Sequence, residues 1–329
     1  MAKSGRWSAV TIFSLALMLA MAGGRLLTAA SRDSNYGSFG PEGPRMREQL
    51  WILPSGDPSL PLRATVFRPA DDQPNGFAGQ SVSNSWKVRR PLVIINHGTD
   101  ESTRESVSMP VFYWLSRWFI ERGYVVVVPQ RRGHGATGGK LAEAFDNCLA
   151  PDHLRAGQIA ADDVEAVLTY MSKQPFVDDQ QTIVVGISSG GWASLALAAR
   201  NPPGLRGVVN FAGGRGAHAG GRLGAVCAAE RLVDAAGTLG KTARAPTLWL
   251  YSANDSYFVP EIAEAMEQAW TAHGGPAELH ILPPYGNEGH NIADDKAGWL
   301  LWGPIVSHFL DGGSSTAAPA LQQRADAKP

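Results

Sequence analysis

Short apolar runs alternate along the chain with longer segments of helical periodicity. The runs "LVII" at 92–95, "VVVV" at 125–128 and "TIVV" at 182–185 carry no charged residue. A strand exposed on one face alternates apolar and polar residues, whereas a strand covered on both faces is apolar along its length. Because helical patterns separate these runs, the sequence predicts a mostly parallel α/β sheet with helices on both faces.

The alternation extends through most of the chain and is interrupted once. We expect strands at 63–67, 92–95, 124–128, 182–185, 207–210, 247–251 and 278–282, and helices at 109–122, 156–173, 189–200, 260–273 and 296–310. Residues 212–243 follow a strand and open with a glycine-rich stretch. We interpret 212–243 as a cap-like insertion that shapes a pocket at the carboxyl edge of the sheet, where open α/β sheets bind ligands. An ordinary long loop is the alternative.

The first residues are typical of an export signal. Lys3 and Arg6 precede the mostly apolar stretch 10–22, and small residues up to Ala22 and up to Ala30 offer two cleavage sites. The apolar stretch is shorter than the roughly 20 residues that a membrane-spanning helix needs. We therefore expect a secreted or periplasmic product without a stable membrane span, with a retained N-terminal membrane anchor as the alternative.

Composition divides the chain into four parts. We predict a signal peptide over 1–30, a polar linker over 31–47, an α/β domain over 48–311 and a disordered tail over 312–329. The net charge is -1, and no basic block with interleaved aromatic residues recurs, so a nucleic-acid partner is not expected. Nothing in the sequence indicates the oligomeric state.

The chain has two cysteines, Cys148 and Cys227, both in loop-like segments. An exported protein meets oxidising conditions, which permit a disulfide between them. Two buried free thiols are the alternative. Without a CxxC spacing the pair predicts no zinc site, and we expect no metal or other cofactor.

The segment "GISSGG" at 186–191 directly follows the run at 182–185 and precedes a helical pattern. In a G-x-S-x-G frame, the serine sits on a sharp turn between strand and helix with its hydroxyl exposed, and the flanking glycines permit close packing. The frame makes Ser188 the candidate nucleophile. Ser189, at the helix N-terminus, would offer its backbone N–H to a developing negative charge.

A serine hydroxyl needs a general base, and the base needs an orienting acid. In this arrangement the expected order along the chain is serine, acid, histidine. Asp255 follows the strand at 247–251, and His290 follows the strand at 278–282, so these two are the predicted acid and base. Glu288 is the alternative acid.

Two further glycine-containing loops bear on the site. The loop "HGTDES" follows the run at 92–95, and we expect the backbone N–H of Thr99 to complete an oxyanion hole. The segment "GHGATG" at 133–138 satisfies a dinucleotide-binding pattern, but it does not join a strand directly to a helix. We therefore expect these glycines to let a loop fold back beneath the nucleophile turn.

Together, "HG" at 97–98, "RRGHGATGG" at 131–139, "GISSGG" at 186–191, "SANDSYFVP" at 252–260 and "GNEGHNI" at 286–292 resemble the α/β-hydrolase superfamily. The resemblance covers roughly residues 48–311 and is nearest to the branch similar to dienelactone hydrolases and prolyl oligopeptidases. It implies an eight-stranded, mostly parallel sheet. This chain departs from dienelactone hydrolases in having serine rather than cysteine as nucleophile, and from prolyl oligopeptidases in lacking a propeller domain.

The resemblance and the candidate triad imply acyl transfer by a serine hydrolase without a cofactor. We expect hydrolysis of a small-molecule carboxylic ester through an acyl-enzyme. An exported peptidase or amidase of the prolyl-oligopeptidase type uses the same residues and is the alternative. A catalytically silent scaffold that only binds its ligand is a third hypothesis.

Overall fold

The computed structural model describes residues 36–72, 88–100, 102–106, 109, 111–145 and 147–312. The predicted signal peptide and its two cleavage sites lie outside the described residues. So do residues 31–35 of the predicted linker and residues 313–329 of the predicted tail. The chain divides into two compact units, 1–37 and 38–329, and only Tyr36 and Gly37 of the first are described. The account below concerns the second unit.

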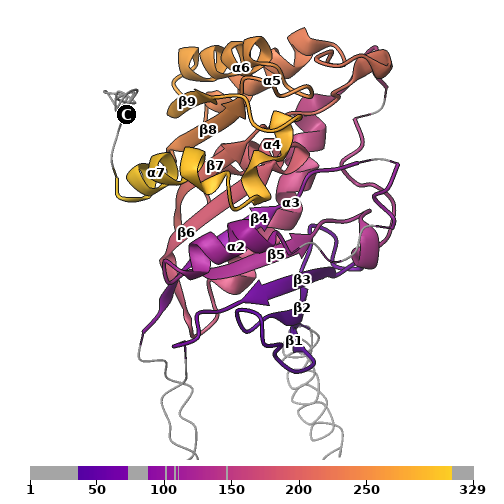
Figure 1. Ribbon diagram of the computed structural model, residues 1–329. Coiled ribbons are helices and arrows are strands. Elements are labelled where there is room, and N and C mark those ends of the chain that lie inside the picture. Colours follow the sequence, from indigo (N-terminus) through magenta and orange to yellow (C-terminus); the bar gives the residue numbers. More distant parts are fainter. Residues whose placement is uncertain are drawn as a thin grey trace, which may run out of the picture. The chain divides into compact units, whose positions relative to one another are not determined.

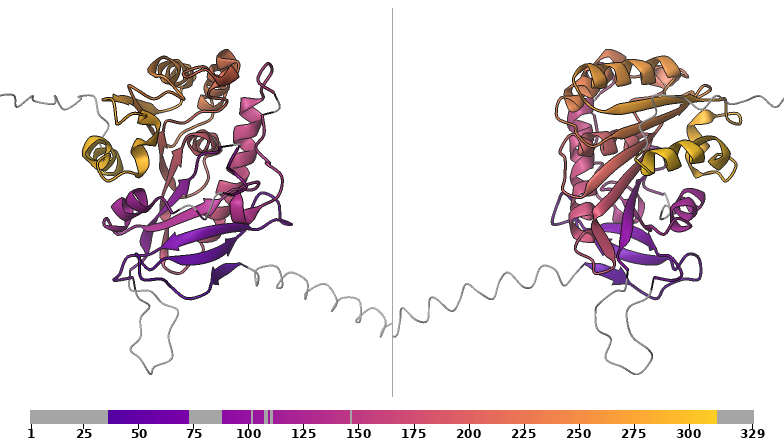
Figure 2. Two further views of the ribbon diagram at one scale, coloured as in Figure 1. Left: turned by 45° about the vertical axis from the view of Figure 1, so that its right-hand side comes forward. Right: turned by 90° about the vertical axis from the view of Figure 1, so that its left-hand side faces the viewer.

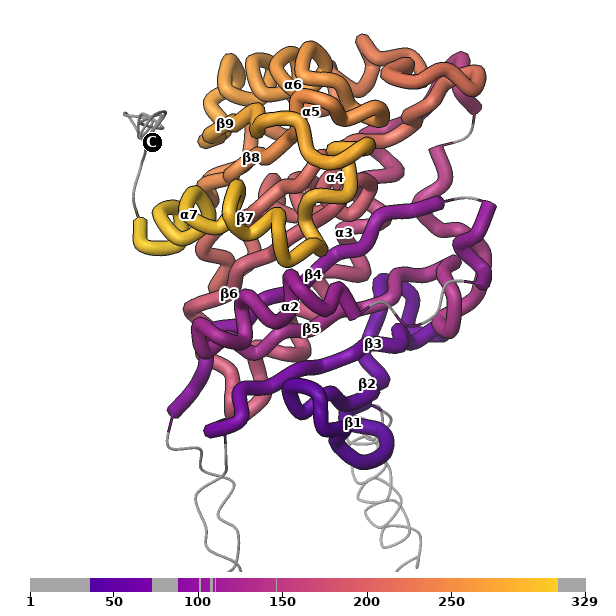
Figure 3. The backbone as a smooth tube through the Cα atoms, viewed as in Figure 1, coloured from indigo at the N-terminus to yellow at the C-terminus, as the bar shows by residue number. Residues whose placement is uncertain are grey.

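Nine strands form one mixed sheet in the order β1-β2-β3-β5-β4-β6-β7-β8-β9 (Figure 1). The strands are β1 (Gly37–Phe39), β2 (Gln49–Leu53), β3 (Leu62–Phe67), β4 (Arg90–Asn96), β5 (Val125–Gln130), β6 (Val177–Ile187), β7 (Leu205–Phe211), β8 (Thr247–Ser252) and β9 (Ala277–Leu282). Strand β3 pairs antiparallel with both β2 and β5, and all pairs from β5 to β9 are parallel. The path of the chain through the sheet can be followed along the tube in Figure 3.

The predicted count of eight strands is wrong by one. Strand β1 lies inside the segment 31–47, which the sequence predicted as a linker, and it is the outermost strand on its side of the sheet. It has three residues, too few for a periodicity to be visible in the sequence. The parallel core of the sheet agrees with the prediction, because the uncharged runs form β4, β5 and the second half of β6.

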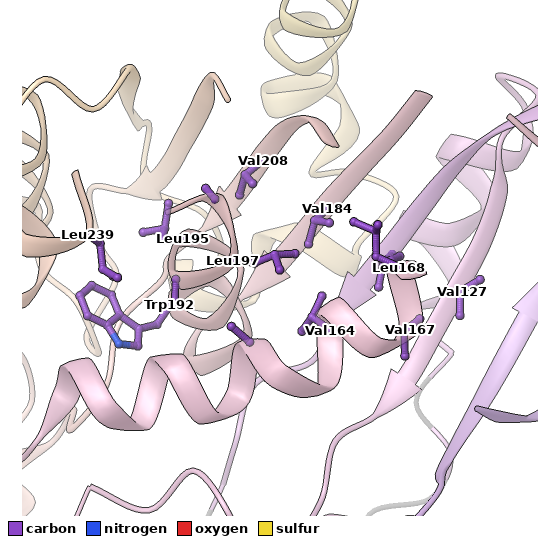
Figure 4. Close-up of a cluster of buried hydrophobic side chains, with 14 of the residues drawn as sticks. Val127, Val164, Val167, Leu168, Val184, Trp192, Leu195, Leu197, Val208 and Leu239 are labelled. Carbon is purple, nitrogen blue, oxygen red and sulfur yellow. The ribbon is translucent and has the colours of Figure 1, made fainter. Parts of the chain in front are cut away.

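Helices cover both faces of the sheet (Figure 2). Helices α3 (His153–Met171), α4 (Ser189–Ala198), α5 (Ala229–Gly240) and α6 (Pro260–Ala272) pack on one face, and α2 (Tyr113–Ile120) and α7 (Trp299–Leu310) pack on the other. Figure 4 shows the core under the first group, where Trp192 and Leu195 of α4 and Val164 of α3 meet side chains of the central strands. Burial on both faces explains why these strands are apolar throughout.

The segment 212–243 contains the short helical turn η3 (Ala219–Gly221), an isolated bridge between Ala217 and Val226, and helix α5. Cys227, in this segment, forms a disulfide with Cys148, which lies 79 residues earlier in the chain. The two Cα atoms are 4.7 Å apart. The disulfide ties the insertion to the loop before α3. Among the described helices, none combines the length and the apolar character that crossing a lipid bilayer requires.

Candidate active site

Ser188 stands on a sharp turn between β6 and α4. It has φ 57° and ψ -125°, a positive φ that is uncommon for residues other than glycine. Its backbone is fixed from several sides, since its N–H donates to the carbonyl of Phe211 at 3.0 Å and its carbonyl accepts from Trp192 at 3.1 Å. Strain of this kind persists only where the surroundings enforce it, and it concentrates at functional sites.

The two glycines of the G-x-S-x-G frame are required by close packing of backbone on backbone. A Cβ atom on Gly190 would lie 2.3 Å from the carbonyl oxygen of Asn96 and 2.4 Å from that of His97. A Cβ atom on Gly186 would lie 2.3 Å from the carbonyl oxygen of Gly190. The turn can therefore form only with glycine at both positions, as the sequence motif predicts.

Asp255 and His290 form a buried pair at the carboxyl edge of the sheet. Nδ1 of His290 lies 3.0 Å from Oδ2 and 3.2 Å from Oδ1 of Asp255, and the two residues are 7% and 2% exposed. An ionised carboxylate only accepts hydrogen bonds, so Nδ1 carries the proton and Nε2 is left to accept one. The ring of His290 also stacks on that of Tyr257, with 4.1 Å between centroids.

Glu288, the alternative acid, has a different place. Its Oε1 accepts from the backbone N–H of His290 at 3.0 Å and from that of Ser256 at 3.1 Å, and Oε2 accepts from the Ser256 hydroxyl. Burial favours the protonated form, but these hydrogen bonds outweigh it and lower the pKa of Glu288. Glu288 therefore joins the two loops that carry Asp255 and His290 and does not contact the imidazole.

Ser188 and His290 line one cavity of about 310 Å³, together with His97, Gly98 and Thr99 among others. Both residues are described in full, and no hydrogen bond joins their side chains. Contacts between nucleophile and base are often long in the absence of substrate and tighten when it binds. The structure thus brings the predicted serine, aspartate and histidine to one edge of the sheet, with the two side chains that would exchange a proton facing a common space.

The predicted oxyanion donors lie next to the nucleophile. The Ser189 hydroxyl donates to that of Thr99 at 2.8 Å, and a Cβ atom on Gly98 would lie 3.0 Å from the Cβ atom of Ser188. Within the described residues, the backbone N–H groups of Thr99 and Ser189 have no protein acceptor. Two unused N–H groups beside a serine hydroxyl are what an oxyanion hole requires.

A buried ion pair, which no motif in the sequence indicates, supports these donors. The guanidinium of Arg131 donates from Nε and Nη2 to the two carboxylate oxygens of Glu143, at 2.7 and 2.9 Å, and from Nη1 to the carbonyl of His97 at 2.7 Å. The Thr99 hydroxyl donates to Glu143 at 3.0 Å. Burial opposes ionisation of Glu143, but the charge of Arg131 outweighs it and holds the pKa of that carboxyl well below its usual range.

Two histidines border this ion pair. Burial, followed by the charge of Arg131, lowers the pKa of His134 to about 4 and that of His97 well below its usual range. Nε2 of His97 accepts from the backbone N–H of Arg131 at 3.0 Å. Both rings are therefore neutral at pH 7, and the contacts of His97 give it a structural role rather than that of a base.

The "GHGATG" loop does not form a dinucleotide site. It contains the short turn η2 (Gly135–Thr137), and the Thr137 hydroxyl donates to the carbonyl of Gln130 at 2.7 Å. The loop thus folds back on the end of β5 instead of leading into a helix. Among the described residues, no group of three or more His, Cys, Asp or Glu side chains is arranged to hold a metal ion.

A second cavity, of about 520 Å³, also borders the nucleophile. Ser188, Thr99, Asp100 and Tyr257 border both cavities, whereas His290 borders only the smaller one. The walls of the second cavity come from the insertion and from the loop before α3, and include both half-cystines. The insertion therefore does line a pocket.

The sequence model of the prolyl oligopeptidase family matches residues 110–213. That stretch includes Ser188 and ends before Asp255 and His290. The chain is similar to dipeptidyl-peptidase 5 of Porphyromonas gingivalis, with 29% identity over 102 residues, which are 31% of this chain and 14% of the relative. The matched stretch is thus about one seventh of the relative's length.

Solved structures extend the likeness to most of the chain. Porphyromonas gingivalis dipeptidyl peptidase 4 superposes with a TM-score of 0.57 at 16% identity, over 82% of this chain and 36% of that one. The acetyl xylan esterase from Paenibacillus sp. R4 superposes with a TM-score of 0.55 at 14% identity, over 94% of this chain and 97% of that one. Both share the fold, and the serine turn lies in the stretch matched by sequence. This chain has the α/β-hydrolase fold. The superposition on the esterase spans nearly the whole of both chains.

Proposed function

We propose that the chain is a serine hydrolase that works through an acyl-enzyme. The observation that carries the proposal is the buried Asp255–His290 pair, 3.0 Å between Oδ2 and Nδ1, at the edge of a cavity that Ser188 also lines. In the proposed reaction, His290 Nε2 takes the hydroxyl proton of Ser188 while Oγ forms a bond to the substrate carbonyl carbon. The N–H groups of Thr99 and Ser189 receive the oxyanion, a contribution of roughly 3 to 4 kcal/mol for each donor in comparable sites.

Collapse of the tetrahedral intermediate breaks the bond to the leaving group, which receives the proton from His290. Water then gives a proton to the same imidazole while its oxygen forms a bond to the acyl carbon. The bond from that carbon to Ser188 Oγ breaks, and the imidazolium returns the proton to Oγ, which releases the acid. The role proposed for Asp255 is to hold the tautomer with the proton on Nδ1 and to stabilise the imidazolium. No cofactor takes part in these steps.

We propose an amide or peptide bond as the preferred substrate. The matches at the level of sequence support this choice, because the family model describes prolyl oligopeptidases and the relative is named a dipeptidyl-peptidase. These findings favour the peptidase alternative over the ester hydrolysis that the sequence first suggested. An ester remains the second candidate on one observation, the superposition of acetyl xylan esterase over 97% of its own length.

We also propose that the protein acts outside the cytoplasm. The bond between Cys148 and Cys227 supports this proposal, since disulfides persist in oxidising compartments.

A test of the mechanism uses Ser188→Ala and its neighbour Ser189→Ala as a matched pair. A fluorophosphonate probe should label the wild type and Ser189→Ala, whose proposed contribution is a backbone N–H, and should not label Ser188→Ala. Turnover by Ser188→Ala should fall to the background rate. Labelling of Ser188→Ala at the wild-type level would remove Ser188 from the mechanism.

Paired substrates test the bond. An N-acylaminoacyl p-nitroanilide and the corresponding p-nitrophenyl ester share one acyl group, so they differ only in the leaving group. We expect turnover of both. Turnover of the ester alone would reject the peptidase proposal and leave the serine mechanism intact.

A further inference from the structure

Tyr257 lies between two histidine rings. Its ring stacks on that of His290, with 4.1 Å between the centroids and 19° between the planes. The ring of His218, which belongs to the insertion, lies 4.0 Å from that of Tyr257 at 35°. Two rings this close to the centre of a third cannot share one of its faces, because their atoms would overlap. The two histidines therefore lie on opposite faces of Tyr257, and the insertion reaches the proposed base through one aromatic side chain.

The turn that carries Tyr257 also carries the proposed acid. The N–H of Tyr257 donates to Oδ1 of Asp255 at 2.8 Å, and Oδ2 of Asp255 lies 3.0 Å from Nδ1 of His290. Asp255 thus holds one edge of the imidazole, while Tyr257 covers one face. A hydrogen bond at an edge leaves the ring free to rotate about the line of that bond. A stacked ring removes this freedom.

His218 is itself fixed against the same turn. Its φ of 56° is uncommon for a residue other than glycine. Its Nε2 lies 3.1 Å from the carbonyl oxygen of Ser256, which also accepts from the N–H of Gly224 at 2.6 Å. A carbonyl oxygen only accepts, so Nε2 carries the proton. These hydrogen bonds join the insertion to the turn and hold the His218 ring against Tyr257.

The face that Tyr257 presents to the imidazole is neutral and rich in π electrons. Burial, followed by the charges of Glu288 and Asp100, raises the pKa of the Tyr257 phenol, which therefore stays protonated. The face of such a ring attracts a cation. In the proposed reaction His290 becomes an imidazolium, so the contact strengthens as the proton is transferred. Only interactions of this kind, which are stronger in the transition state, accelerate a reaction.

We propose that Tyr257 is a positioning residue for His290, with His218 supporting its other face. The stack keeps the imidazole in the plane from which it can take the proton of Ser188 and pass it to the leaving group. This proposal rests on the proposed serine mechanism and assigns the insertion a part in it. An anilide must receive a proton from His290 to depart, whereas p-nitrophenolate leaves without one, so the stack should matter more for amides than for esters.

The kinetic test removes the ring in Tyr257→Leu and keeps it in Tyr257→Phe. We expect Tyr257→Leu to lower kcat for the N-acylaminoacyl p-nitroanilide roughly 10- to 30-fold, the upper range for a desolvated cation–π contact. The loss in kcat/KM for the corresponding ester should be only about threefold. Tyr257→Phe should keep both rates, and His218→Leu should give a smaller loss in the same direction. Since Tyr257 also borders both cavities, a loss confined to KM would mean a substrate contact and would overturn the proposal.

Tyr285→Leu is the matched control. Tyr285 belongs to the segment between β9 and His290, and among the described residues its ring does not stack on the imidazole. Partial unfolding would lower the anilide and ester rates equally, so the ratio of the two rates is insensitive to purely structural damage. We expect Tyr285→Leu to keep the wild-type ratio. An equal fall of this ratio in Tyr257→Leu and Tyr285→Leu would overturn the proposal.

A spectroscopic test separates this proposal from the proposed mechanism. The ring current of Tyr257 should shift the carbon-bound ring protons of His290 upfield in the NMR spectrum, where they are assigned by their absence in His290→Gln. The shift should remain in Tyr257→Phe and disappear in Tyr257→Leu. If Ser188 is not the nucleophile, the shift persists while the labelling experiment fails. Unchanged His290 resonances in Tyr257→Leu would show that the rings do not stack and would overturn the proposal, whatever the labelling result.

Discussion

The carboxylate of Asp255 accepts from Nδ1 of His290 at 3.0 Å, while its Oδ1 accepts from the backbone N–H groups of Tyr257 and Phe258 at 2.8 and 3.0 Å. The hydrogen bonds to the backbone fix the carboxylate before it meets the imidazole. In Asp255→Asn the amide oxygen can keep the backbone contacts, and the amide NH₂ then faces Nδ1. Because the amide NH₂ donates to Nδ1, the ring proton would have to sit on Nε2. Nε2 could then no longer accept the hydroxyl proton of Ser188. We expect kcat to fall roughly 10³- to 10⁴-fold with little loss of stability.

Glu288→Gln is the control for Asp255→Asn. Glu288 accepts from backbone and hydroxyl groups near the histidine without touching the ring. We expect kcat to fall by less than about tenfold, because a glutamine oxygen can replace one of the acceptors. If Glu288→Gln is the more damaging variant in the same steady-state assay, the acid has been assigned to the wrong residue.

The buried His134 predicts how stability depends on pH. Its pKa is about 4 in the folded protein, since burial and then Arg131 disfavour its charged form, against about 6.5 in an unfolded chain. As pH falls from 7 toward 4, the unfolded chain binds a proton that the folded protein does not, so stability falls through this window. His134 accounts for at most about 3 kcal/mol of this loss in the free energy of unfolding. Denaturant titrations between pH 7 and pH 4 measure it.

His134→Gln should reduce the slope of stability against pH, because glutamine does not titrate. The exposed His308 in α7 supplies the control, and His308→Gln should leave the slope as in the wild type. A slope in His134→Gln equal to that of the wild type would show that His134 is not the group responsible. His97, whose pKa is also lowered by burial, keeps part of the slope in every variant.

The sequence predicted the parallel core and the positions of the candidate triad because each depends on a local signal. Strands β4, β5 and β6 are uncharged over their buried lengths, and Ser188 lies in a frame that backbone packing enforces. Strand β2 carries no such signal, since it lies near the edge of the sheet and mixes buried with exposed residues.

The contacts around Glu143 could not be predicted for a different reason. Arg215 reaches Glu143 across 72 residues, and no spacing in the sequence announces that two loops will meet. Arg131 is fully buried behind the loop that carries Thr99, where no motif places it. Residues that act through a neighbour rather than through a motif become visible only in the folded chain.

Gly190 tests whether the serine turn depends on backbone contact. Its Cβ position lies within 2.4 Å of two carbonyl oxygens, those of Asn96 and His97, which belong to the strand and loop behind the turn. Gly190→Ala should cost about 3 kcal/mol of folding free energy, or more where the backbone cannot move. Activity should fall as well, because the displaced loop carries Thr99. Thermal denaturation and turnover measure the two effects.

Gly220→Ala separates crowding from backbone strain. Gly220 has φ +62° and nothing within 4 Å of its Cβ position, so alanine there meets strain alone. We expect a cost of about 1 to 2 kcal/mol and unchanged turnover of a neutral substrate. Equal losses of stability in the two variants would mean that the contacts behind Gly190 relax without cost.

The disulfide between Cys148 and Cys227 should contribute to both stability and substrate binding. The bond closes a loop of 79 residues, and removing it in Cys148→Ser/Cys227→Ser should cost about 2 to 4 kcal/mol of folding free energy. Because both residues line the cavity of about 520 Å³, the double variant should also raise KM for an N-acylaminoacyl p-nitroanilide. Dithiothreitol should lower the melting temperature of the wild type toward that of the double variant and leave the double variant unchanged. The disulfide would be contradicted if the wild-type melting temperature did not respond to the reductant and thiol titration found both cysteines free. That result would also remove the support that the disulfide gives to an extracytoplasmic location.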